Sequence, residues 1–351
     1  MSSRGSGAGR AGTKKPEDAF SPGAIVGERY RIERVVGSGA MGAIYEASAD
    51  GEGPRFALKT LAMDLRAGAT AGDAEERRAR FEREAAVCAT IRHPHVVPVL
   101  GHGIDERTEV PYLVMPLLEG QDLAALLDRI GSLAPGVAAA LFVQACEGLG
   151  AVHASGVVHR DVKPSNLFLV REQQRIVLKV TDFGLAKVLG DEDGMGGGLT
   201  ATGRFMGTPQ YVSPEQAVSA KHVDARSDVF SLAMSLYHAL SGAPAFAHAK
   251  SFMQLVLEIT SREAPSLEDQ APWVPSGFIR VVHGALLRDP GARCPSVAEL
   301  ALALETVCGI DATTQAVTVE SLKPPSLEER GQAPRRPRAE LPSEWADVLR
   351  E

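Results

Sequence analysis

Acidic, cationic and amide side chains gather in two short segments of the sequence, His159–Asn166 (HRDVKPSN) and Thr181–Gly184 (TDFG). Asp, Asn and Ser are common in turns, so each residue alone has a plain structural explanation. Together the two segments supply what transfer of a phosphoryl group requires: a carboxylate at the attacking hydroxyl, oxygen ligands for a metal ion, and a cation near the phosphate oxygens. Asp161, Asp182 and Lys163 are therefore candidates for that chemistry.

A glycine cluster precedes these segments. The run GSGAMG, with Gly37, Gly39 and Gly42, lies between two strand-like runs, YRIERVV and AIYEAS. Such a cluster is often a plain turn, and dinucleotide-binding folds use the same spacing. In those folds a helix follows the glycines, whereas here a returning strand follows. A glycine hairpin lets main-chain N–H groups approach phosphates without interference from side chains.

Lys59 stands in the apolar, strand-like run RFALKTL, where the plain explanation is a charge at a strand end that faces solvent. A lysine in the wall of a cleft would need a carboxylate partner, and the next helical stretch, DAEERRARFEREAAVCATIR, offers several. At about 100° per residue, one face of that helix contains Phe81, Ala85, Cys88 and Ile91. Glu84 falls within this face and Glu82 points away from it, so Glu84 is the predicted partner of Lys59.

The two halves of the sequence predict different secondary structure. Strand-like runs with one helix come first, and helical patterns dominate afterwards, which predicts an α+β fold of two lobes. We place a small β-rich lobe at residues 28–115, a hinge at 116–119 and a larger helical lobe at 120–310. Residues 1–27, rich in Gly and Ser, are predicted to be disordered, and residues 311–351 to form a polar, proline-rich tail. A cleft between two lobes is a common place for a ligand.

Composition excludes several classes of protein. The 351 residues have a formal charge of −7, which argues against a nucleic-acid binder because phosphate neutralisation needs a basic face. The four cysteines form no C-x-x-C pair, which indicates small buried residues and neither a disulfide framework nor a zinc site. We recognise no secretory signal, membrane-length apolar run or lipidation motif, so we expect a soluble cytoplasmic protein without a membrane span.

The glycine hairpin, Lys59, HRDVKPSN and TDFG together resemble the eukaryotic-type (Hanks-type) Ser/Thr protein kinases, from about Tyr30 to Ile310. The runs FEREA, HPHVV and SPEQA are similar to the bacterial branch of that family. The resemblance implies a bilobal protein-kinase fold and transfer of the γ-phosphate of ATP, with Mg²⁺, to Ser or Thr hydroxyls of protein substrates. Lys163, followed later by Gly207-Thr208-Pro209, accompanies Ser/Thr specificity in that family.

The resemblance also assigns roles to individual residues. Asp161 accepts the proton of the substrate hydroxyl and Lys163 steadies the γ-phosphate, while Lys59 holds the α- and β-phosphates and pairs with Glu84. The implied metal ligands are Asn166 and Asp182. The residues implied to surround ATP are Val36, Gly37, Ser38, Gly39, Gly42, Ile44, Ala57, Lys59, Met115, Pro116, Leu118 and Phe168.

Within that set, the resemblance makes Ile44 and Ala57 the roof of the adenine site and Phe168 its floor. An acidic residue is usual at the position of Pro116. The expected adenine contacts are the carbonyl of Pro116 and the N–H of Leu118, so the N–H that proline lacks is not needed.

Further roles concern the segment that receives the substrate. Ser213-Pro214-Glu215 frames this segment, and Ser213 replaces the usual alanine, which we interpret as an exchange of one small residue for another. Arg293 is expected to pair with Glu215, and Asp228 to anchor the catalytic loop.

Autophosphorylation is expected at Thr200 and Thr202. A phosphate there could pair with Arg160, and the reaction would proceed between two copies in a transient homodimer.

Two alternatives belong to other functional classes. A kinase-like scaffold without activity would normally lack Lys59, Asp161 or Asp182, and all three are present. A small-molecule kinase of related fold would not normally carry the Gly-Thr-Pro and Ser-Pro-Glu segment.

Overall fold

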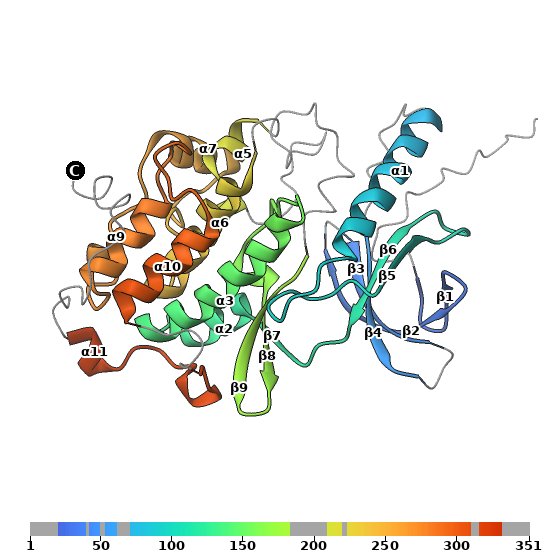
Figure 1. Cartoon of the computed structure of the whole chain (residues 1–351), viewed down its shortest axis with the longest axis horizontal. Helices are drawn as coiled ribbons and strands as arrows, with labels where there is room; N and C mark the ends of the chain where they lie inside the picture. Colours follow the sequence, from blue (N-terminus) through green and yellow to red (C-terminus); the bar gives the residue numbers. More distant parts are fainter. Residues whose placement is uncertain are drawn as a thin grey trace, which may run out of the picture.

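The computed structural model describes residues 20–39, 42–49, 53–61, 71–182, 209–219, 223–309 and 316–331. They form a sheet-rich lobe and a helical lobe, which Figure 1 shows side by side. The predicted two-lobed α+β fold is confirmed.

The small lobe contains a six-stranded antiparallel sheet in the order β1-β2-β3-β4-β6-β5. Its strands are β1 (Ile25–Val26), β2 (Tyr30–Gly39), β3 (Gly42–Ala49), β4 (Arg55–Thr60), β5 (Gly101–Ile104) and β6 (Pro111–Pro116). Successive side chains of a strand point to opposite faces. Tyr45 and Leu58, which pair across β3 and β4, are buried together on one face. Ile44 and Lys59, the next pair, therefore occupy the other face.

The helix α1 (Ala71–Cys88) presents the predicted face to the interior. Phe81, Ala85 and Cys88 are buried, and the ring of Phe81 lies edge-on to His102 of β5 at 6.4 Å. Glu84 is half-buried within this face and Glu82 is exposed. Burial, and to a smaller extent the negative charge of Glu84, raises the pKa of Cys88 to about 11, so this cysteine is a neutral apolar filler, as predicted.

The large lobe surrounds the apolar helix α3. Its helices are α2 (Leu123–Ile130), α3 (Pro135–Ala154), α5 (Pro214–Val218), α6 (Ala225–Ser241), α7 (Phe252–Ser261), α8 (Leu267–Gln270), α9 (Ser276–Ala285), α10 (Val297–Cys308) and α11 (Leu327–Gly331). A second sheet, β7-β8-β9, is formed by Gly120–Asp122, Leu167–Glu172 and Arg175–Val180. Helix α3 packs against α6, α10 and β9 (Figure 1).

Helix α3 also corrects one sequence-based expectation. Among the described residues it alone is long and apolar enough to cross a membrane, although we expected no stretch of that kind. Most of its side chains are buried in the large lobe, including Leu141, Phe142 and Leu149, so its apolar character is explained by packing in the lobe core.

The folded part of the chain begins earlier than predicted. Phe20 is 3% exposed and packs edge-on against Tyr45, with ring centroids 6.0 Å apart. Val26 is fully buried, and β1 pairs with β2. Residues 20–27 are therefore part of the small lobe, which corrects the predicted boundary at residue 28. A single aromatic residue in a Gly-rich stretch was too weak a signal to reveal this.

The predicted C-terminal tail also contributes to the fold. The carbonyl of Val317 accepts a 2.7 Å hydrogen bond from the N–H of Ile176 in β9, and Val317 is 3% exposed. The guanidinium of Arg330 lies 5.2 Å from the ring centroid of Trp273. Residues 316–331 therefore pack against the large lobe (Figure 1), and only the remainder of the predicted tail lies outside the described residues.

Candidate active site

Three of the predicted reactive groups converge on one loop between α3 and β8. The Nζ of Lys163 lies 2.8 Å from Oδ2 of Asp161, and Nδ2 of Asn166 donates to the same oxygen at 3.0 Å. Asn166 also donates to the main-chain carbonyl of Asp161 at 2.8 Å. The Asp161 carboxylate is thus oriented by two donors, from a lysine two residues away and an asparagine five residues away. Pro164, at the start of a short 3₁₀ turn, helps bring these three side chains together.

This loop is anchored from below by Asp228, as predicted. Asp228 lies in the first turn of α6 and is fully buried. Its carboxylate accepts hydrogen bonds from the main-chain N–H groups of His159, at 2.7 Å, and Arg160, at 2.8 Å. His153, near the end of α3, contacts the same carboxylate through Nε2 at 2.8 Å. His153 could not be identified from the sequence, because nothing local distinguishes a histidine at the end of a helix.

Two residues of the site have a left-handed backbone conformation that is uncommon outside glycine. They are Arg160, with φ 62°, and Asp182, with φ 60°. Such conformations are unfavourable and persist where surrounding contacts impose them. For Arg160 the contact with Asp228 is one of these, and it sets the direction of the chain just before Asp161.

The two lobes meet at an ion pair between Lys59 and Asp182. Nζ of Lys59, on β4, lies 2.8 Å from Oδ1 of Asp182, and both side chains are largely buried. Lys59 of the small lobe is thus paired with a carboxylate of the large lobe, that of Asp182. Glu84, the partner expected from the sequence, lies on the inner face of α1, and its pairing with Lys59 stays a prediction.

The glycine hairpin is formed by β2 and β3, which pair from Gly37 with Ile44 to Gly39 with Gly42. Gly42 has φ 134°, and a Cβ there would lie 1.9 Å from the carbonyl oxygen of Thr60, so the protein itself requires glycine. At Gly37 and Gly39 a Cβ would meet no atom of the described residues within 4 Å. The described part of the fold thus gives no reason for glycine at these two positions, which is the situation expected where a ligand approaches the main chain.

The residues expected around adenine come from both lobes. Ile44 and Ala57 are half-buried on the face of the sheet that also carries Lys59, and Ala57 pairs with Met115 of β6. Leu118 is half-buried in the connection between β6 and β7, just after Pro116. Phe168 belongs to β8 of the large lobe. Val36 and Ser38 are exposed on β2 beside the glycines.

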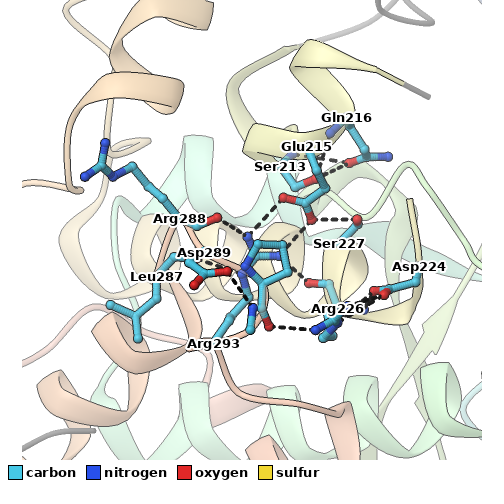
Figure 2. Close-up of polar contacts among 12 residues, drawn as sticks. Ser213, Glu215, Gln216, Asp224, Arg226, Ser227, Leu287, Arg288, Asp289 and Arg293 are labelled. Carbon is cyan, nitrogen blue, oxygen red and sulfur yellow. Dashed lines mark hydrogen bonds and ion pairs between the residues drawn. The ribbon is translucent and has the colours of Figure 1, made fainter. Parts of the chain in front are cut away.

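The predicted pair of Glu215 and Arg293 is confirmed (Figure 2). The guanidinium makes two hydrogen bonds to the carboxylate, Nη1 to Oε1 at 2.8 Å and Nη2 to Oε2 at 3.0 Å. The hydroxyl of Ser227 donates to Oε1 at 2.6 Å. Burial raises the pKa of the Glu215 carboxyl, but the hydrogen bonds from Arg293 and Ser227 outweigh burial and leave the pKa below its usual range.

Helix α5 begins with a capping box that the sequence analysis did not recognise. The hydroxyl of Ser213 accepts from the N–H of Gln216 at 3.3 Å, and the side-chain oxygen of Gln216 accepts from the N–H of Ser213 at 3.2 Å. The sequence pattern S-x-x-Q was the available signal. Ser213 thus supplies a hydroxyl that alanine would lack, which corrects the interpretation of this position as an exchange of one small residue for another.

Several expectations concern residues outside those that the structure describes. They are Phe183, Gly184, Thr200, Thr202, Gly207 and Thr208. Expectations for the phosphorylation sites and for the rest of residues 183–208 therefore stay predictions.

A family model described as "Protein kinase domain" matches residues 30–302. "Serine/threonine-protein kinase pkn2" of Myxococcus xanthus is 36% identical over 282 residues, which are 80% of this chain and 32% of that protein. "Serine/threonine-protein kinase PknH" of Mycobacterium tuberculosis is 34% identical over 274 residues, 78% of this chain and 41% of the other. The chain thus spans less than half the length of these curated relatives.

Solved structures agree with the family match. The kinase domain of Mycobacterium tuberculosis PknI superimposes with a TM-score of 0.63 at 25% identity, and the match covers 83% of this chain and all of that domain. The shared fold extends over both lobes, since the match covers so much of each chain.

Proposed function

Because the chain belongs to the protein kinase family, we propose that it is an active protein-serine/threonine kinase that transfers the γ-phosphate of ATP to Ser and Thr hydroxyls of proteins. The observation that supports this most directly is the Asp161 carboxylate, held by Lys163 at 2.8 Å and Asn166 at 3.0 Å on a loop anchored by buried Asp228. A kinase-like scaffold without activity has no need for such an arrangement.

Each group has a role in this proposal. Asp161 accepts the proton of the attacking hydroxyl, and Lys163 beside it offsets negative charge on the transferred phosphoryl group. Lys59, with Glu84 behind it, holds the α- and β-phosphates. Lys163 and Asn166 both donate to Oδ2 of Asp161, which restrains the orientation of this carboxylate.

The donor set fits Mg²⁺. Asp182 and Asn166 would hold the metal, which would offset the negative charge of the phosphates. Among the described residues, no group of three or more His, Cys, Asp or Glu side chains could hold an ion. Mg²⁺ typically uses one or two carboxylates together with phosphate oxygens, so Asp182 and the amide oxygen of Asn166 suffice as protein ligands. The amide nitrogen of Asn166 faces Asp161, which directs its oxygen away from that residue.

The glycine hairpin and the neighbouring face of the small-lobe sheet fit a nucleoside triphosphate. The open space above Gly37 and Gly39 lets phosphates approach the main chain of the hairpin. On the opposite face of the sheet from the small-lobe core, Ile44 and Ala57 offer an apolar surface to adenine.

We also propose that the chain phosphorylates itself at Thr200 and Thr202 in a transient homodimer, and that the reaction takes place in the cytoplasm, in signal transduction. The four cysteines support a reducing compartment, since each is a free thiol. A double variant Thr200→Ala/Thr202→Ala tests the first point: phosphopeptide mapping should lose these sites and activity on an added substrate should fall.

The experiment that tests the proposal is mass spectrometry after incubation of purified protein with ATP, Mg²⁺ and a dephosphorylated lysate. New phosphoserine and phosphothreonine should appear with the wild type. Asp161→Asn should lower transfer by roughly 100-fold or more while leaving ATP binding largely intact. Lys59→Met should also be inactive, through lost phosphate positioning.

The matched control is Asp269→Asn, an exposed carboxylate on α8, which should behave as wild type. Transfer by Asp161→Asn at the wild-type rate would rule out Asp161 as the base. A folded wild-type protein that binds ATP and transfers nothing would favour the scaffold alternative.

A further inference from the structure

Gln216 links the helix that frames the substrate segment to the catalytic loop. Its side-chain oxygen accepts from the N–H and the hydroxyl of Ser213, both at 3.2 Å. Its side-chain nitrogen donates to the main-chain carbonyl of Arg160 at 2.9 Å, across 56 positions of the chain. Only one orientation of the amide satisfies both ends, because two donors face its oxygen and an acceptor faces its nitrogen.

The accepting carbonyl belongs to the peptide unit directly before Asp161. Arg160 has φ 62°, and its own N–H donates to Asp228 at 2.8 Å. At the other end of the peptide unit, the N–H of Asp161 lies 3.3 Å from Nδ1 of His159. The carbonyl and the N–H of this unit are therefore both held, the first by Gln216 and the second by His159.

Helix α5, which carries Gln216, is itself fixed in the large lobe. Glu215 makes the two-bond pair with Arg293, whose side chain is fully buried. Gln216 follows Glu215 directly, so the position of its amide nitrogen is set by this pair and by the cap at Ser213. The capping box alone does not need the second contact, because the oxygen of Gln216 completes it. The nitrogen is thus available for a second function.

We propose that Gln216 is a positioning residue for phosphoryl transfer. Its amide nitrogen fixes the peptide unit between Arg160 and Asp161, and thereby the direction in which the Asp161 carboxylate points. Docking of α5 and alignment of the catalytic carboxylate are then one coupled event. This role rests on the proposed kinase activity and concerns the turnover step, with no part in nucleotide binding.

Two substitutions separate the two ends of the side chain. Gln216→Glu keeps an acceptor for Ser213 and loses the donor, so a carboxylate oxygen faces the carbonyl of Arg160. Gln216→Lys keeps a donor for that carbonyl and loses the acceptor for the cap. With a peptide substrate, we expect Gln216→Glu to lower kcat roughly 10- to 100-fold with little change in KM for ATP. Gln216→Lys should retain more of kcat than Gln216→Glu.

A matched control exists on α7. Ser251 caps that helix, the N–H of Gln254 donates to Ser251, and the side-chain oxygen of Gln254 accepts from the N–H of Lys250 at 3.0 Å. Gln254→Glu makes the same chemical change at an exposed cap and should keep the wild-type kcat. A purely structural role for Gln216 predicts the opposite ranking, with Gln216→Lys more damaged than Gln216→Glu, and that ranking would overturn the proposal. Wild-type kcat in Gln216→Glu would overturn it too.

Crystal structures of the two variants give a readout that does not depend on activity. The peptide unit between Arg160 and Asp161 should rotate in Gln216→Glu and keep its orientation in Gln216→Lys. An unchanged peptide unit in Gln216→Glu would contradict the positioning role. Should the wild-type protein transfer no phosphate, the proposed function fails on its own, and these two structures still decide what Gln216 does.

Discussion

Asp228 is fully buried and Glu215 largely buried in the large lobe, but the partners of the two carboxylates differ in kind. Asp228 receives two main-chain N–H groups of one loop, from His159 and Arg160, together with the ring of His153. Glu215 receives the guanidinium of Arg293 and the hydroxyl of Ser227. Asp228 thus binds mainly main-chain groups, whereas the partners described for Glu215 are side chains.

The two sets of partners have different structural effects. A carboxylate that binds consecutive N–H groups fixes the backbone conformation of a short segment, here the residues just before Asp161. The guanidinium of Arg293 also donates to the carbonyls of Arg226 and Leu287, so the Glu215 pair joins α5, the start of α6 and the loop before α10 (Figure 2). In the proposed kinase, Asp228 would therefore serve mainly the alignment of Asp161, and Glu215 mainly the assembly of the lobe.

The largest expected effect is on activity, from Asp228→Asn. The new amide can accept through one atom only, so its NH₂ group would face a main-chain N–H of the catalytic loop. We expect kcat to fall by roughly 100-fold or more because Asp161 loses its alignment. The measurement is kcat together with the affinity for ATP, which should change much less. A folded Asp228→Asn variant with near-normal kcat would contradict the proposal that Asp228 aligns the residues before Asp161.

The next effect is on stability, from Arg293→Met. This change leaves Glu215 without its charged partner in a largely buried site, and breaking such a pair costs about 3 to 5 kcal/mol. Denaturant unfolding measures the loss. Combining Arg293→Met with Glu215→Gln should recover part of the lost stability, since the stranded charge is then gone. A loss below about 1 kcal/mol in Arg293→Met would show that the pair contributes little.

A smaller effect appears in the pH dependence of unfolding. The folded pKa of Glu215 lies below its usual value of 4.5, so its ionised form stabilises the fold above that pH. This contribution is lost as the pH falls through the folded pKa. The stability difference between wild type and Glu215→Gln should therefore be constant above about pH 5.5 and shrink in more acidic solution. A difference that stays constant down to pH 3 would contradict the lowered pKa.

The smallest effect on activity is expected from shortening the chain. A chain ending at residue 315 loses the packing of Val317 and Leu322, and burial of one such side chain is worth about 1.5 to 3 kcal/mol. The melting temperature should fall by several degrees, about 2 to 4 °C for each kcal/mol, while kcat stays within about twofold. A chain ending at residue 331 keeps these contacts and is the control. An unchanged melting temperature in the shorter chain would show that residues 316–331 add nothing.

The proximity of Asp161, Lys163 and Asn166 could be predicted because these residues are close together along the chain, while their roles in catalysis stay predictions. Asp161, Lys163 and Asn166 lie within one turn-rich segment, so their motif also fixes their approximate geometry. The anchoring residues Asp228 and Arg293 were predicted through resemblance to a family. Helix periodicity correctly placed Glu84 on the inner face of α1 and Glu82 outside.

Contacts between distant segments were harder to predict. The pair of Lys59 and Asp182 joins two lobes, and no local pattern specifies it. Phe20 and Val317 are single apolar residues in stretches whose average composition is polar or glycine-rich, so composition predicted disorder or a tail. The hydrogen bond from Gln216 to Arg160 depends on the position of α5 in the large lobe, and that position is set only by the complete fold.

The contact between Val317 and β9 has one more consequence. Strand β9 is at the edge of its sheet, and an edge strand with unpaired N–H groups is a template for pairing with another chain. One end of this edge is covered where Val97 and His95 bond to Val180, and the other where Val317 bonds to Ile176. A chain that ends at residue 315 keeps helix α10 whole and would expose the second end. Such a fragment should therefore self-associate at concentrations at which the full chain stays dispersed.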